Sequence, residues 1–146
     1  MDFSNINTAA DADKGAILHF KHPQSGHLLY TGKGADEFGR LADKSLPYEA
    51  VTARVRGLES QAMSNAIKSA EQRLMKSPDA ANDPEHRFDT AIALVTELHG
   101  VMDGKRVLAA SRDDLKWLFE RSENLAVQVV QFAGDSANFF AGNLTS

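Results

Sequence analysis

The chain contains no cysteine among its 146 residues. This absence excludes disulfide bonds, thiolate ligands for metal ions and cysteine nucleophiles. It also fits a reducing compartment, in which disulfide bonds rarely persist. A chain of this length is expected to form one domain around one core, because domains usually span about 100–200 residues.

Long hydrophobic runs are also lacking. A membrane-spanning helix needs about 20 apolar residues, but the longest apolar runs here, such as residues 91–95 and 107–110, span only a few. The first residues contain no basic stretch followed by an apolar one, so no secretory signal peptide is expected. We therefore expect a soluble protein that does not bind membranes.

No part of the chain carries an excess of positive charge. Lys and Arg number 16 against 20 Asp and Glu, and the resulting net charge of −4 is spread evenly along the sequence. Proteins that bind nucleic acid usually concentrate basic residues to neutralise phosphates. We therefore expect no nucleic acid among the partners.

Alternation of apolar and polar residues predicts a β-rich part at residues 16–58. Two partly alternating runs, 16–23 and 27–31, flank a turn that contains Pro23 and Gly26, which is typical of a β-hairpin. A third strand with one solvated face is predicted around Val51 to Val55. Residues 1–15 fit either a short helix or a mobile arm.

Helical spacing of apolar residues begins at residue 59 and continues to about 140. The first predicted helix has Ser60 as its N-cap, and its apolar stripe comprises Ala62, Met63, Ala66, Ile67, Ala70, Leu74 and Met75. A second helix is predicted from Pro84 to Met102, followed by a stop at Gly104. Its predicted buried stripe comprises Phe88, Ala91, Ile92, Val95, Leu98 and Met102.

Two further helix starts are predicted at Ser111 and Ser122, before a polar tail at residues 141–146. The predicted fold class is therefore α+β, in a single domain of residues 1–146. A small N-terminal antiparallel sheet, made of the hairpin and the third strand, is followed by three to four packed helices.

Histidines are the main candidates for chemistry. His19, His22 and His27 lie close in sequence, but no carboxylate stands at a usual ligand spacing, so solvated hairpin histidines are favoured over a metal site. His86 and Asp89 lie three residues apart on a predicted helix, without a nucleophile or a metal on which to act. We expect no catalytic residue, no cofactor and no metal.

Aromatic residues gather near the C-terminus, and two interpretations of them stay open. Leu118, Phe119 and Phe132 fit a core position that closes the helical layer over the sheet. Trp117 lies off the main apolar stripe, and two phenylalanines follow a Gly-Asp-Ser break, as in a surface that awaits a partner. The aromatic residues in question are Trp117, Phe119, Phe132, Phe139 and Phe140.

The segment 113–139 carries two short motifs, Gln128-Val129-x-x-Phe132 and Asp135-x-x-Asn138-Phe139. They follow a helix that ends in Leu118-Phe119. This arrangement resembles the C-terminal signature of the tail assembly chaperones of long-tailed bacteriophages. The N-terminal half is similar too, because family members often begin with a hairpin, a third strand and a helix.

This resemblance implies a non-catalytic chaperone that binds the tape measure protein, keeps it soluble and helps recruit tail tube subunits. Such a protein acts in the host cell cytoplasm and is absent from the mature virion, and many relatives have a longer frameshifted product. The expected partner-binding residues are Trp117, Phe119, Gln128, Phe132, Asn138, Phe139 and Phe140. The alternatives are a structural tail, head–tail connector or terminator component retained in the virion and, third, a small histidine-dependent enzyme. A homo-oligomer also stays open.

Overall fold

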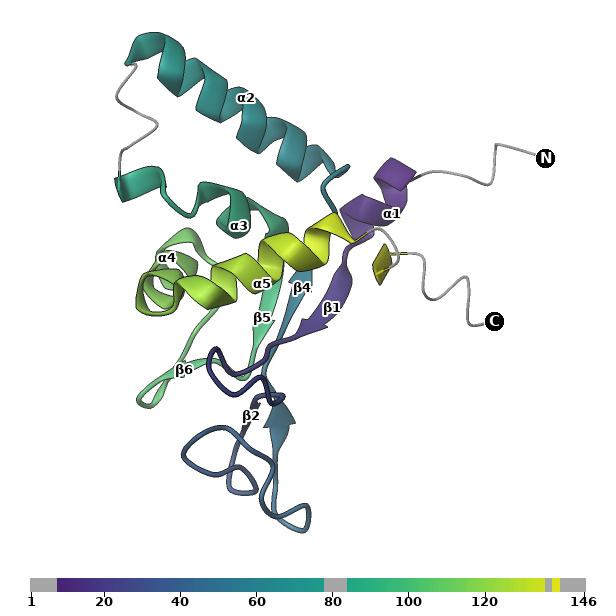
Figure 1. Cartoon of the computed structure of the whole chain (residues 1–146), viewed down its shortest axis with the longest axis vertical. Coiled ribbons are helices and arrows are strands. Elements are labelled where there is room, and N and C mark those ends of the chain that lie inside the picture. The colour runs from purple at the N-terminus through teal and green to yellow at the C-terminus, as the bar shows by residue number, and fades with distance from the viewer. Residues whose placement is uncertain (1–7, 78–83, 136–137, 140–146) are drawn as a thin grey trace, which may run out of the picture.

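The computed structural model describes residues 8–77, 84–135 and 138–139 (Figure 1). Within them the chain has the predicted α+β fold, in which helices lie against a small antiparallel sheet. The sheet contains β1 (Ala16–His19), β4 (Thr52–Val55) and β5 (Val95–His99) in the order β1-β4-β5. The central strand β4 is thus the third strand that the sequence predicts.

The two faces of the sheet differ as the alternation in β4 requires. Ala53 and Val55 point into the core and are fully buried. On the other face Arg54 lies opposite Ile17 of β1 and Glu97 of β5, and its Nε lies 3.2 Å from the Glu97 carboxylate. Helices therefore cover one face, while the other carries charged side chains.

The predicted hairpin forms only near its turn. The backbone N–H of His22 donates to the carbonyl of His27 (2.8 Å), and Gly26 adopts a positive φ of 74°. Beyond Leu29 the chain turns away from β1, and β2 (Tyr30–Thr31) pairs with β3 (Glu49–Ala50) instead. The second strand of the hairpin and β4 compete for the same edge of β1, and β4 pairs with all four residues of β1.

For residues 1–15 the sequence allows either a short helix or a mobile arm. The part of this region that the structure describes contains helix α1 (Thr8–Lys14). It packs at the start of helix α2 (Gln61–Lys76), where the Asp13 carboxylate accepts the N–H of Gln61 at 2.7 Å. Ser60 is the N-cap of α2 as predicted, and its hydroxyl accepts the N–H of Met63 at 3.2 Å. Both termini of the described chain lie near this end of α2 (Figure 1).

The predicted second helix is wrong beyond Leu94. A 3₁₀ turn, η3 (Pro84–His86), leads into the short helix α3 (Asp89–Leu94), after which the chain extends as β5. Pairing with β4 overrides helical spacing here, because Val95 and Thr96 are β-branched and Leu98 faces the core opposite Ala53. The sheet therefore takes one strand from the C-terminal half.

The last two helices begin where the sequence predicts, but Met102, predicted on the buried stripe of a helix, is an exposed residue of a strand. Strands β6 (Met102–Asp103) and β7 (Arg106–Val107) form a hairpin around Gly104, whose φ is 60°. Helix α4 (Arg112–Arg121) is capped by the Ser111 hydroxyl, which accepts the N–H of Asp114 at 3.2 Å. Helix α5 (Glu123–Gly134) follows after Ser122.

The core lies between the sheet and helices α3, α4 and α5. Its largest fully buried side chains are Phe20, Leu94, Leu108, Leu115, Phe119, Val55 and Val129. In the part of the chain that the structure describes, no helix is long and apolar enough to cross a membrane.

Candidate functional site

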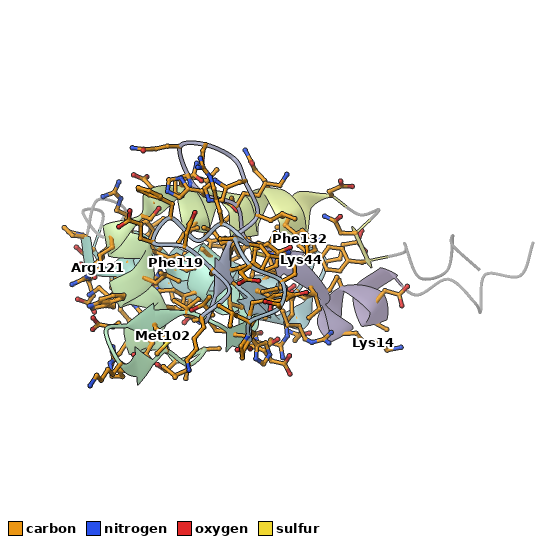
Figure 2. The ribbon with its side chains drawn as sticks, turned by 90° about the horizontal axis from the view of Figure 1, so that it is seen from below. Lys14, Lys44, Met102, Phe119, Arg121 and Phe132 are labelled. Carbon is orange, nitrogen blue, oxygen red and sulfur yellow. The ribbon has the colours of Figure 1, made fainter. Side chains whose placement is uncertain are left out.

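Phe119 belongs to the core and is not part of a surface. Its side chain is fully buried, and its ring centroid lies 6.0 Å from that of Phe88. In Figure 2 it lies among the side chains that fill the middle of the molecule. A partner could reach this ring only by opening the core, so the core interpretation replaces the partner-binding one for Phe119.

Trp117 is partly buried against the same core and already has a partner. The guanidinium carbon of Arg121, one helical turn later, lies 3.8 Å from the centre of the Trp117 ring. The same guanidinium donates to the Trp117 carbonyl at 3.1 Å. This cation–π contact fixes the exposed side of the indole within α4.

Gln128 holds two distant parts of the chain together. Its Oε1 accepts the backbone N–H of Lys21 at 2.9 Å, and its Nε2 donates to the Lys21 carbonyl at 2.8 Å. The side-chain amide thus replaces a neighbouring strand for Lys21, beyond the end of β1. The amide is used within the molecule and fastens the hairpin region to α5.

The closing Asn-Phe pair also turns inward. The Asn138 side-chain amide donates to the carbonyl of Phe132 at 2.9 Å, and the rings of Phe132 and Phe139 meet edge to face at 5.8 Å. Phe139 also lies against Gly57, where an added Cβ would come within 3.3 Å of its ring. Phe140 lies outside the described residues.

Helix α2, in contrast, leaves apolar side chains uncovered. None of its residues is buried, and the exposed fractions of Ile67, Leu74 and Met75 are 47%, 42% and 87%. We call these three residues the α2 face. Helix α3, on which α2 packs, is only about 9 Å long against about 24 Å for α2, so it covers only part of α2.

A groove of about 270 Å³ runs between α3 and α5. Exposed Val127 and Val130 form its α5 side, and Phe88 and Ala91 lie beneath them. The groove also contains Arg87, Thr90, Glu123, Ala126 and Gln131. The lining is mostly apolar, and we call it the α3–α5 groove. Sequence reasoning missed it because α5 alone looks like an ordinary core helix.

A second cleft, of about 370 Å³, lies beside β2 and the loop that follows it. Asp36 is on its rim, and the N–H groups of Arg40 and Phe38 donate to this carboxylate at 2.9 and 2.8 Å. The hydrogen bond from Arg40 is the main cause that lowers the pKa of Asp36. The carboxylate therefore stabilises its own loop and is poorly suited to proton transfer.

The histidines are used in local structure. The Nδ1 of His22 accepts the N–H of Gln24 at 3.1 Å, and the imidazole of His22 stacks on that of His27 with centroids 4.9 Å apart. His27 Nε2 lies 2.8 Å from the carbonyl of Phe38. Among the described residues, no three His, Cys, Asp or Glu side chains are placed to hold a metal ion.

His86 and Asp89 do approach each other, at 2.8 Å, but within an ion-pair network. The Asp89 carboxylate also receives Arg73 from α2 at 3.1 Å and Arg112 from α4 at 2.9 Å. Asp89 therefore joins three helices through charge-assisted contacts.

Comparison with known proteins found no matching family model, no matching curated protein and no matching solved structure.

Proposed function

We propose that this protein is a tail assembly chaperone of a long-tailed phage. In this proposal it binds apolar helical segments of the tape measure protein, keeps them soluble in the host cytoplasm and helps recruit tail tube subunits, without catalysing a reaction. The supporting sequence motifs are those of segment 113–139. The observation that carries the proposal is the α2 face, which offers apolar surface that the rest of the described chain leaves uncovered.

The physical basis is burial of apolar surface on both partners. An exposed aliphatic side chain gains about 25 cal/mol for each Å² that a partner removes from water. Met75 adds an unbranched, adaptable side chain, which suits a surface that must accept several similar segments. A chaperone of this kind needs modest affinity, because the partner must be released during assembly.

The test is co-expression with the tape measure protein of the same phage. We expect the wild-type chain to keep that protein in the soluble fraction and to co-purify with it. The double variant Ile67→Gln/Leu74→Gln should lose at least half of the soluble tape measure protein, because glutamine keeps the helix but removes apolar surface. Val107→Gln, an exposed apolar position on β7, is the matched control.

Two outcomes would contradict the proposal. One is soluble tape measure protein at the wild-type level with the double variant, while thermal unfolding shows both chains equally stable. The other is mass spectrometry of purified virions that finds this chain in stoichiometric amount. The latter result would instead support the alternative of a structural tail component.

A further inference from the structure

A cavity of about 220 Å³ lies where α2, α3 and α4 meet. Ser69 and Arg73 line it from α2, Asp89 lines it from α3, and Arg112 lines it from α4, while its other lining residues are apolar. We call it the Asp89 cavity, because the ion pairs of Asp89 hold these three helices together around it.

Two guanidinium groups from different helices converge on one carboxylate in this cavity. The Nη2 of Arg73 lies 3.1 Å from one oxygen of Asp89, and the Nη2 of Arg112 lies 2.9 Å from the other. Neither contact uses the Nε or the Nη1 of its guanidinium, and each arginine carries five N–H donors. The carboxylate therefore keeps the two guanidiniums close together without using all of their donors.

The charges that line the cavity do not balance. Arg73 and Arg112 carry two positive charges, and Asp89 carries the one negative charge among the residues that line it. His86 also contacts this carboxylate, at 2.8 Å, and protonation of its ring adds positive charge. The lining therefore has at least one net positive charge.

Charged residues near the cavity do not cancel this excess. The carbonyl of Glu85 accepts from Arg112 at 3.2 Å, but the Glu85 carboxylate lies 2.9 Å from Lys116, so these two side chains neutralise each other. The whole chain has a net charge of −4, but Lys and Arg exceed Asp and Glu by one across the segments that form the cavity, namely residues 61–76, 84–94 and 112–121. The positive charge is thus a local feature of this part of the molecule.

The donors of the cavity suit an oxyanion with oxygens in several directions. Guanidinium groups pair with carboxylates and phosphates through parallel N–H···O bonds. A carboxylate is planar, so it serves one guanidinium well, whereas a phosphate has further oxygens and can bridge Arg73 and Arg112. The hydroxyl of Ser69, which lines the same cavity, can donate another hydrogen bond.

We propose that the Asp89 cavity binds a phosphate-type oxyanion between the guanidiniums of Arg73 and Arg112. This site is independent of the proposed function, because it uses neither the α2 face nor a protein partner. A ligand bound there joins α2 to α4 and so stabilises the folded chain.

The test is a titration of the full chain with inorganic phosphate at constant ionic strength. The signals to follow are those of the arginine Nε–H groups in proton–nitrogen NMR spectra. We expect saturable shifts for Arg73 and Arg112, with a Kd in the millimolar range. Arg87, which pairs with Glu123 at the α3–α5 groove, is the internal control and should show none. Shifts that grow linearly with phosphate, or equal shifts of Arg87, would overturn the inference.

A variant and its control test the guanidinium contact. Arg112→Gln should weaken phosphate binding at least about tenfold, because it removes charge-assisted hydrogen bonds. Arg87→Gln, which also removes an exposed arginine from an ion pair, should change the Kd less than about twofold. Wild-type affinity in Arg112→Gln would contradict the proposal. If a variant fails to fold, the wild-type titration decides the question.

Asp89→Asn should have an effect of the opposite sign. Asparagine keeps the size of the side chain and removes the negative charge that repels an anion, so phosphate should bind at least about threefold more tightly. If the network only held the helices together, this variant would bind phosphate no better than the wild type. Unchanged or weaker binding by an Asp89→Asn chain that circular dichroism shows to be folded would therefore overturn the inference.

Sulfate and acetate define the class of anion. Sulfate has the tetrahedral oxygens of phosphate and should bind within about fivefold of it, whereas acetate should bind at least about tenfold more weakly. Equal affinity for acetate and phosphate would contradict the assignment to a phosphate-type anion.

Discussion

The C-terminal segment and helix α2 treat their apolar residues in opposite ways. Phe119 is fully buried, and Phe132 and Phe139 close on each other at the end of α5. On α2, by contrast, Ile67 and Leu74 remain almost half exposed, although their spacing is that of a core helix. The difference shows that coverage by neighbouring elements, and not aromatic content, decides which apolar residues are available to a partner.

The polar residues of the C-terminal motifs make the same point. Gln128 pairs with the backbone of Lys21, and Asn138 pairs with the carbonyl of Phe132. A motif of this kind can be characteristic of a fold because it fastens α5 to the hairpin region and closes the end of the helix. Gln128 and Asn138 then have structural roles, and the proposed partner surface is the α2 face.

Among the variants that test this contrast, Phe119→Ala has the largest expected effect on stability. We expect the free energy of unfolding to fall by about 3–5 kcal/mol, the usual cost of removing a buried phenylalanine ring. Phe38→Ala, at an exposed loop position, is the matched control and should cost less than about 0.5 kcal/mol. Urea unfolding followed by circular dichroism measures both. Equal costs for the two variants would break the contrast.

A smaller effect is expected for Gln128→Ala. The change removes both hydrogen bonds to Lys21 and should cost about 1–3 kcal/mol, because the backbone groups of Lys21 lose their partners. Gln131→Ala, on the same helix but exposed, should cost less than about 0.5 kcal/mol. An unchanged midpoint for Gln128→Ala, together with intact capture of the tape measure protein, would contradict a structural role. Loss of capture at unchanged stability would restore Gln128 as a binding residue.

The smallest expected effect is on the loss of folding stability at low pH. The N–H of Ala109 and the guanidinium of Arg106, which contact the Asp114 carboxylate at 2.9 and 2.6 Å, lower the pKa of Asp114. Its folded pKa is below its unfolded pKa of about 3.9, so its contribution to stability is present above that pH and is lost as pH falls through the folded pKa.

We therefore expect Asp114→Asn to reduce the loss of stability between about pH 7 and about pH 3.5. Urea midpoints at the two pH values measure it, and Asp113→Asn, an exposed neighbour, is the control. An identical pH dependence in both variants would show that Asp114 does not help to hold α4 against the β6–β7 hairpin.

Much of the fold follows from local signals in the sequence. Ser60 and Ser111 cap helices because a hydroxyl at the N-cap can accept a helix N–H, which depends on neighbouring residues only. The change from helix to strand at Val95 could not be predicted in this way. It depends on pairing between β4 and β5, whose partners lie 40 to 47 positions apart in the sequence.

The candidate surface was harder to predict than the fold. The apolar stripe of α2 is visible in the sequence, but its exposure follows from the shortness of α3, which the sequence conceals by continuing a helical spacing into β5. The role of Gln128 depends on a contact across 107 positions. Long-range packing therefore decided which residues of the two regions are structural and which are exposed.

The central proposal is that the α2 face, and not the C-terminal aromatic residues, meets the partner. Hydrogen–deuterium exchange of the complex with the tape measure protein tests it most directly, because a docked helix slows the opening of the helices that it covers. We predict slower exchange in residues 61–76, with no change in residues 112–121. Protection confined to residues 112–121, with α2 exchanging as in the free protein, would contradict the account.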